Sequence, residues 1–287
     1  MSRNWTWYRP TSLYEAVGLL IAYGTDSVIV AGGTSVGLNP PRRDGLSMID
    51  LQELELTTVV RMDGVTRLGA LVTAHTLTTS DQLDSVGSGL LRVTGSTMGP
   101  RPVRNRITLG GNVMQPFRWS DLPVSLLALD AKFELYGPKG FRTIAADELL
   151  ATQPRRQLLP GELLAWADVA VDAPGEGGCF LKLHWTKVDH AVASVAVKLA
   201  LVDGRCDRLR LALGALAPLP QRWTSVEEAL VGTELDDESI AQALTNAQPS
   251  RVVAEQRAEA DYKLQVARTL AARALRTARD HAKGGVA

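Results

Sequence analysis

Two glycine pairs constrain this chain more than any other feature. One lies in segment 28–35 and the other in segment 104–113, and each follows a short apolar run and precedes a small polar side chain. A glycine pair after a strand lets the backbone turn sharply and leaves its N–H groups unshielded, so such a turn can approach a phosphate closely. Two turns of the same design suggest that both hold one extended, phosphate-bearing ligand.

Length and charge limit the kinds of protein that this chain can be. Its 287 residues indicate two or three packed units, and 31 basic residues balance 31 acidic ones. The balanced charge gives no basic field for nucleic acid or a membrane surface. No apolar run reaches the length of a membrane span, and the first eight residues lack the apolar core of a signal peptide.

The two cysteines narrow the class further. Cys179 and Cys206 lie far apart and form no C-x-x-C pair. This spacing excludes an internal cysteine-ligated iron–sulfur cluster and a zinc ribbon. The simplest interpretation is a reduced, cytoplasmic protein.

The order of apolar patterns predicts an α+β fold that begins with a small α/β lobe over residues 1–56. A helix over 11–23 has Thr11 or Ser12 as its cap and Glu15 at the position of a capping box. A buried strand over 27–30, the first glycine turn, a loop over 37–45 and a strand over 48–51 follow.

A larger α+β lobe over residues 57–174 completes the predicted first domain. Its expected strands are a hairpin over 58–62 and 65–71, a pair over 132–136 and 141–144, and a strand over 161–171. A helix begins within 76–81, residues 95–102 are too rich in Gly and Pro for a regular element, and a helix covers 122–129.

A break rich in Gly, Pro and Asp at 172–178 predicts a domain boundary after residue 174. The C-terminal domain, 175–287, is expected to combine a small antiparallel sheet with helices. The expected strands are 180–183, 194–202 and 209–213, and the expected helices are 225–230, 237–247 and 254–282.

Motifs for chemistry by the chain's own side chains are missing from the sequence. It contains no G-x-S-x-G, H-E-x-x-H or P-loop pattern, and the first glycine segment is not G-x-G-x-x-G. His75, His184, His190 and His281 do not stand at metal-ligand spacing. We therefore predict no catalytic residue and no metal ligand in this chain, and a bound cofactor that carries the chemistry.

Several segments together resemble one family. Segment 31–35 resembles the first FAD pyrophosphate loop of the medium subunit of molybdenum hydroxylases, the carbon monoxide dehydrogenase, aldehyde and xanthine oxidoreductase family. Segment 104–112 is similar to the second loop of that family, 121–131 to the stretch after it, and 214–218 to its C-terminal domain. The resemblance runs over nearly the whole chain.

The resemblance implies that FAD lies extended between the two lobes. Backbone N–H groups of both glycine segments would hold the pyrophosphate, Asp121 would lie near the adenosine end, and Lys182 and Asp189 would lie near the flavin ring. Asp121 also suits a plain helix cap, and Lys182 a surface lysine. The implied cofactor-binding residues are Ala31, Gly32, Gly33, Thr34, Ser35, Val36, Thr108, Gly110, Gly111, Asn112, Asp121, Leu164, Lys182 and Asp189.

This chain departs from the family pattern near the expected flavin ring. Phe117, Arg118 and Trp119 stand where small residues are usual, and His190 stands where an aromatic or aliphatic residue is common. The departures affect the expected contacts of the flavin ring more than those of the pyrophosphate.

The resemblance implies an oxidoreductase subunit of a heteromeric molybdenum hydroxylase. It would pass electrons from [2Fe–2S] clusters of a small partner subunit through FAD to an external acceptor. A large partner subunit would carry molybdopterin, and the assembly would be a dimer of heterotrimers. Two alternatives stay open: a stand-alone flavin oxidoreductase with its own substrate, and a scaffold subunit that binds flavin poorly.

Overall fold

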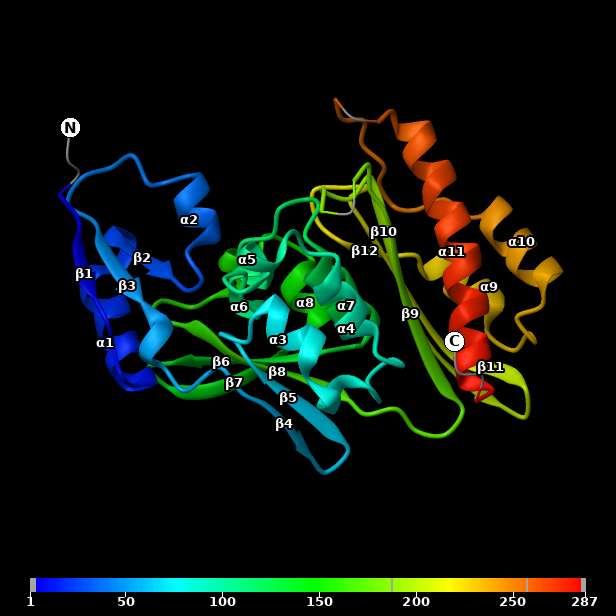
Figure 1. Cartoon of the computed structure of the whole chain (residues 1–287), viewed down its shortest axis with the longest axis horizontal. Coiled ribbons are helices and arrows are strands. Elements are labelled where there is room, and N and C mark those ends of the chain that lie inside the picture. The colour runs from blue at the N-terminus through cyan, green and yellow to red at the C-terminus, as the bar shows by residue number, and fades with distance from the viewer. Residues whose placement is uncertain (1–3, 187, 257, 285–287) are drawn as a thin grey trace.

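Three sheets form the framework of the protein (Figure 1). The computed structural model describes residues 4–186, 188–256 and 258–284, so Met1 to Arg3 of the N-terminal segment considered above lie outside the described residues. In Figure 1 the first lobe lies at one end, the second lobe in the middle and the C-terminal domain at the other end. The mixed helix and sheet composition confirms the predicted α+β class.

The first lobe is a small parallel sheet with strand order β1-β3-β2 and helices around it. Helix α1 begins after Ser12, whose hydroxyl accepts the N–H of Glu15 at 3.2 Å, and the Glu15 carboxylate accepts the N–H of Thr11 at 2.8 Å. The predicted cap is therefore confirmed. The elements are β1 (Thr6–Tyr8), α1 (Leu13–Tyr23), the 3-10 turn η1 (Gly24–Asp26), β2 (Ser27–Val30), α2 (Thr34–Leu38), β3 (Ser47–Asp50) and η2 (Leu51–Glu53).

The second lobe is an antiparallel sheet with strand order β4-β5-β8-β6-β7. The predicted hairpin, strand pair and long strand all belong to this sheet. The strands are β4 (Val59–Met62), β5 (Val65–Gly69), β6 (Lys132–Gly137), β7 (Gly140–Ala145) and β8 (Leu163–Ala170). The helices are α3 (Ala74–Thr79), η3 (Asp81–Leu83), α4 (Leu90–Ser96), α5 (Arg101–Arg104), α6 (Leu109–Met114), α7 (Asp121–Ala128), α8 (Ala146–Leu150) and η4 (Pro154–Gln157).

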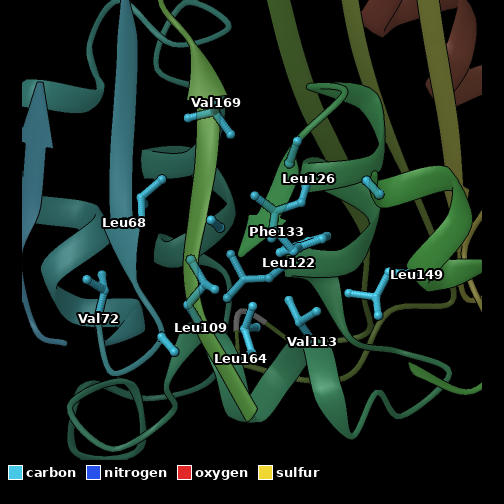
Figure 2. Close-up of a cluster of buried hydrophobic side chains, with 14 of the residues drawn as sticks. Leu68, Val72, Leu109, Val113, Leu122, Leu126, Phe133, Leu149, Leu164 and Val169 are labelled. Carbon is cyan, nitrogen blue, oxygen red and sulfur yellow. The ribbon is translucent and has the colours of Figure 1, made fainter. Parts of the chain in front are cut away.

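Helices α6 and α7 pack on this sheet and form the main core (Figure 2). Leu109 of α6 and Leu122 of α7 point toward Phe133 of β6 and Leu164 of β8, and all four side chains are buried. Because α6 carries the second glycine pair, this core fixes the position of that pair relative to the sheet.

The C-terminal domain is an antiparallel sheet of order β12-β11-β10-β9 with helices on one side (Figure 1). Helix α11 packs along β9 and β10, as its predicted apolar stripe requires. The elements are β9 (Glu176–Leu183), β10 (Ala193–Val202), β11 (Arg205–Gly214), β12 (Gln221–Arg222), α9 (Thr224–Leu230), α10 (Asp237–Asn246) and α11 (Ala260–Ala282).

Several predicted element bounds are wrong. Strands β1 and β12 were not expected, and α3 begins after Thr73 rather than within 76–81, because the Thr73 hydroxyl accepts the N–H of Thr76. Segment 95–102 was expected to contain no regular element, yet α4 extends into it and α5 begins within it, since Pro102 is tolerated in a first helical turn. Helix α11 begins at Ala260, six residues later than predicted.

The glycines of the predicted linker have a packing role. Gly177 and Gly178 belong to β9, although segment 172–178 was expected to be irregular. A Cβ atom on Gly177 would lie 2.2 Å from the carbonyl oxygen of Ala278 in α11, and one on Gly178 would lie 2.6 Å from the carbonyl oxygen of Gly87. These glycines let β9 approach a helix and a loop closely, which composition alone does not distinguish from flexibility.

A buried ion cluster ties the second lobe to the C-terminal domain. Lys198 of β10 pairs with Asp172 and, at 2.9 Å, with Glu176. The Asp172 carboxylate also accepts the N–H groups of Gly87 and Ser88 at 2.7 Å each. Lys198 is 6% exposed, so its ammonium depends on these carboxylates for compensation of the lost hydration.

We predict that Lys198→Met lowers the free energy of unfolding by about 3 kcal/mol near neutral pH, because it leaves two carboxylates without their cation. Burial raises the pKa of Glu176, but Lys198 more than offsets this, so the pKa lies below its ordinary value of 4.5. Protonation of Glu176 therefore removes stability as pH falls below about 4.5, and this acid loss should shrink in the variant.

Urea unfolding of both proteins between about pH 7 and about pH 3.5 measures the effect. The exposed Lys139→Met is the control and should match the wild type. Equal stabilities for Lys198→Met and Lys139→Met would contradict the role of the cluster.

Candidate functional site

A cavity of about 510 Å³ lies where the first lobe, the second lobe and the segment after β9 meet. Its walls come from segments far apart in the sequence, including β2, the first glycine segment, α6, β8, Lys182 and residues 188–190. All fourteen residues predicted to bind the cofactor line it, namely Ala31, Gly32, Gly33, Thr34, Ser35, Val36, Thr108, Gly110, Gly111, Asn112, Asp121, Leu164, Lys182 and Asp189.

The first glycine segment ends in a helix rather than in the predicted loop. Gly33 has a φ of 76°, a conformation that favours glycine, and it caps helix α2. The expected loop over 37–45 is therefore wrong at its start, because the last two residues of α2 occupy it. Within the described residues, the N–H groups of Thr34, Ser35 and Val36 have no acceptor. The turn thus presents free donors to the cavity.

Gly32 brings the two glycine segments together. A Cβ atom at this position would lie 1.4 Å from the carbonyl oxygen of Arg106, so no other residue fits without backbone movement. The Arg106 Nε donates to the carbonyl oxygen of Gly32 at 3.0 Å, and Nη1 donates to Gln52 at 3.1 Å. The first lobe is therefore in backbone contact with the segment that precedes α6.

The second glycine pair is helical, which corrects the prediction of a turn after a strand. Gly110 and Gly111 lie in α6, the N–H of Gly110 donates to Ala70 at 2.7 Å, and the N–H of Gly111 donates to the Thr108 hydroxyl at 3.2 Å. A Cβ atom on Gly110 would lie 2.9 Å from the Cβ of Ala70. The pair permits close packing, and both of its N–H groups are already used.

Three residues that line the cavity each carry a buried polar atom without a hydrogen-bond partner. These atoms are the Ser35 hydroxyl, Oδ1 of Asn112 and Oδ1 of Asp121. The Asn112 amide also donates to the Ser120 hydroxyl at 3.3 Å. An unsatisfied buried polar atom costs about 1–3 kcal/mol. Such atoms are rare in native proteins, and a bound ligand with matching polar groups would satisfy them.

Lys182 and Asp121 form a buried ion pair at one end of the cavity. Their Nζ and Oδ2 atoms are 2.7 Å apart, and the side chains are 4% and 3% exposed. Lys182 also donates to the carbonyl oxygen of Thr97 at 3.2 Å. Burial raises the pKa of Asp121, and the charge of Lys182 opposes that rise.

The structure around this pair changes three sequence-based expectations. Lys182 is buried, so the surface-lysine alternative is wrong, and Ser120 rather than Asp121 occupies the cap position of α7. The expectation that Asp121 and Lys182 lie at opposite ends of an extended dinucleotide is also wrong, because their side chains touch. The Asp121 and Lys182 side chains therefore lie at the same place in the cavity wall.

Three stacked rings line the cavity beside this ion pair. The ring centroids of Phe117 and Trp119 are 5.2 Å apart with nearly parallel planes, and those of Trp119 and His190 are 4.3 Å apart. Arg118, between the two aromatic residues in sequence, is outside the cavity lining and pairs with Glu255 at 3.0 Å. Sequence analysis noted these residues only as departures, because their stacking depends on tertiary contact.

Sequence reasoning missed two further groups of lining residues. Arg155 of η4 lines the cavity. Apolar side chains of β2 and β8 also line the cavity, among them Val28, Ile29 and Leu163. No local motif marks them, because the fold alone brings η4, β2 and β8 together.

The described residues limit what else the chain can hold. They contain no group of three or more His, Cys, Asp or Glu side chains arranged to hold a metal ion. None of the helices in the described part combines the length and apolar character needed to cross a bilayer.

Comparison with known families assigns both parts of the chain. Residues 3–169 match the model of the FAD binding domain in molybdopterin dehydrogenase, and residues 179–278 match that of the CO dehydrogenase flavoprotein C-terminal domain. The first match spans both lobes, and the second spans most of the C-terminal domain.

Individual relatives are similar along their whole length. The carbon monoxide dehydrogenase medium chain of Afipia carboxidovorans is 30% identical, with 98% of each chain covered. The 6-hydroxypseudooxynicotine dehydrogenase complex subunit alpha of Paenarthrobacter nicotinovorans is 30% identical over 95% of this chain and 93% of its own.

Solved structures of relatives have a similar fold. A chain of carbon monoxide dehydrogenase from Hydrogenophaga pseudoflava superimposes with a TM-score of 0.88 at 28% identity, covering 97% of this chain and 98% of that chain. Together with the two family matches, this similarity shows that the chain belongs to the family of FAD-binding medium subunits of molybdenum hydroxylases, and is an oxidoreductase subunit.

Proposed function

We propose that this chain binds FAD in the 510 Å³ cavity and passes electrons from [2Fe–2S] clusters of a partner subunit through FAD to an external acceptor. The observation that supports this most directly is the group of three partnerless buried atoms in the cavity wall, on Ser35, Asn112 and Asp121. Free N–H groups at the start of α2 add donors. FAD supplies the electron-transfer chemistry, and the chain supplies its binding and surroundings.

The pyrophosphate is proposed to lie at the first glycine segment. Thr34, Ser35 and Val36 offer N–H donors, and negative charge is favourable at the start of a helix. At the second glycine pair the Asn112 side chain, rather than the N–H groups of Gly110 and Gly111, is proposed to contact the cofactor. Thr108 fixes this helix start by accepting the N–H of Gly111.

Two parts of the cavity lining suit different ring systems. One part of the lining carries the Lys182–Asp121 pair and the stacked rings of Phe117, Trp119 and His190, and we assign it to the isoalloxazine ring, which has polar edges and aromatic faces. Asp189 lies on the same segment. The apolar lining residues of β2 are assigned to the adenosine.

The partners and domain organisation are part of the proposal. We propose a large molybdopterin-binding subunit, a small [2Fe–2S] subunit and a dimer of heterotrimers located in the cytoplasm. The relatives named above are a medium chain and a complex subunit, which supports an assembly of several chains. Residues 1–174 would form the FAD-binding domain and 175–287 the C-terminal domain.

The first experiment is purification of the chain from its native host, with an absorbance spectrum and identification of co-purifying chains. We predict a flavin spectrum, release of FAD on denaturation, and two partner chains that carry molybdopterin and iron–sulfur clusters. A colourless chain that takes up no added FAD would support the flavin-poor scaffold instead. Turnover of an organic substrate by the isolated chain would support a stand-alone flavin enzyme.

A second prediction concerns Ser35→Ala. The substitution removes a buried hydroxyl that has no partner in the protein alone, so the stability of the flavin-free chain should stay equal or rise. Its affinity for FAD should fall roughly 5- to 30-fold, which corresponds to the loss of one hydrogen bond of about 1–2 kcal/mol. Thermal unfolding of the flavin-free protein and FAD titration measure the two effects.

Thr66→Val is the matched control for this variant. The Thr66 hydroxyl is also buried without a partner, but Thr66 lies in β5 outside the cavity lining. Its replacement should raise stability and leave FAD affinity unchanged. Wild-type affinity in Ser35→Ala would refute the assigned contact.

A further inference from the structure

The charges that line the cavity are unevenly compensated. Among the described lining residues, Lys182 and Arg155 are the lysine and arginine side chains. The ammonium of Lys182 is paired with Asp121 at 2.7 Å. Arg155 has no carboxylate within ion-pair distance in the part of the chain that the structure describes, so its guanidinium is the cation of the wall without an anionic protein partner.

A neutral acceptor holds this guanidinium at the wall. Arg155 Nη2 donates to Oε1 of Gln115 at 2.6 Å, and Gln115 also lines the cavity. Arg155 is an exposed residue at the edge of the cavity, and the protein around it lowers the pKa of its guanidinium, because the charged form loses part of its hydration. Arginine nevertheless stays charged near neutral pH, so this contact leaves a full positive charge beside the cavity.

Gln115, which holds Arg155, lies close in sequence to the second glycine pair. The N–H of Gln115 donates to the carbonyl oxygen of Gly111 at 3.2 Å, so Gln115 lies one helical turn beyond Gly111. One turn rises about 5 to 6 Å. Gln115, Gly111 and Asn112 therefore belong to one short stretch of the cavity wall, and Arg155 is held at that stretch.

We propose that Arg155 binds the phosphate groups of the ligand in this cavity, and so makes the site selective for a dinucleotide over the flavin alone. The inference rests on the proposed function, because it takes the ligand to be FAD. A pyrophosphate carries two negative charges, and the planar guanidinium presents paired donors that match phosphate oxygens. The Gln115 side chain orients the guanidinium without neutralising it.

The same turn provides a matched control. Arg156 follows Arg155 in η4 and is exposed like Arg155, but it does not line the cavity. It also has no ion pair among the described residues. Arg155→Gln and Arg156→Gln therefore remove the same charge from neighbouring positions, and only the first should change phosphate binding.

The experiment measures binding of FAD, ADP and riboflavin to the full-length, flavin-free chain by titration calorimetry. Arg155→Gln should weaken both FAD and ADP roughly 10- to 100-fold, the effect of one charge-assisted contact, and leave riboflavin unchanged. The salt dependence of ADP binding should also become less steep. Arg156→Gln should match the wild type in all three titrations.

Two results would overturn the assignment to Arg155. ADP and FAD affinities in Arg155→Gln equal to those of Arg156→Gln would exclude phosphate contact, and an equal loss of riboflavin binding would indicate a distorted cavity instead. Arg155→Lys, which keeps the charge, should bind ADP with intermediate affinity and provides a second test if the glutamine variant folds poorly. A wild-type chain that binds neither FAD nor ADP would instead overturn the proposed function itself.

Discussion

The backbone contact between Gly32 and Arg106 is the constraint on which the rest of the site depends. The two segments approach so closely that a Cβ atom on Gly32 would lie 1.4 Å from the Arg106 carbonyl oxygen. The Arg106 side chain adds a hydrogen bond between the same two residues, because its Nε donates to the carbonyl oxygen of Gly32 at 3.0 Å. Because the first lobe is fixed to the segment before α6 at this point, the walls of the cavity keep a defined separation.

A cavity held open in this way has a cost in stability. The side chains of Ser35, Asn112 and Asp121 each leave a buried polar atom without a partner. In a protein selected for stability alone, such groups would be paired or replaced by apolar ones. These three residues line the same cavity, where a ligand could complete their interactions.

The sequence predicted the elements better than the contacts. The three-part α+β fold and the first glycine turn were accessible, because capping residues and apolar periodicity are local signals. The predictions were wrong for glycines whose role depends on tertiary contact. Gly110 and Gly177 are typical of a turn and a linker in sequence, yet each lets another segment pack closely. The pairing of Lys182 with Asp121 was likewise inaccessible, because 61 residues separate them.

The C-terminal domain helps to position the stacked rings of Phe117 and Trp119 that line the cavity. Arg118 lies between Phe117 and Trp119 and pairs with Glu255, which also accepts from the buried Lys263 at 2.6 Å. The N–H of Ala215 donates to the carbonyl oxygen of Arg118 at 3.2 Å. The loop that carries the stacked rings is therefore held from the C-terminal side, while the first glycine segment is held from the opposite lobe. Both ends of the site thus depend on contacts between parts of the chain that are distant in sequence, which explains why no single segment carries a complete binding motif.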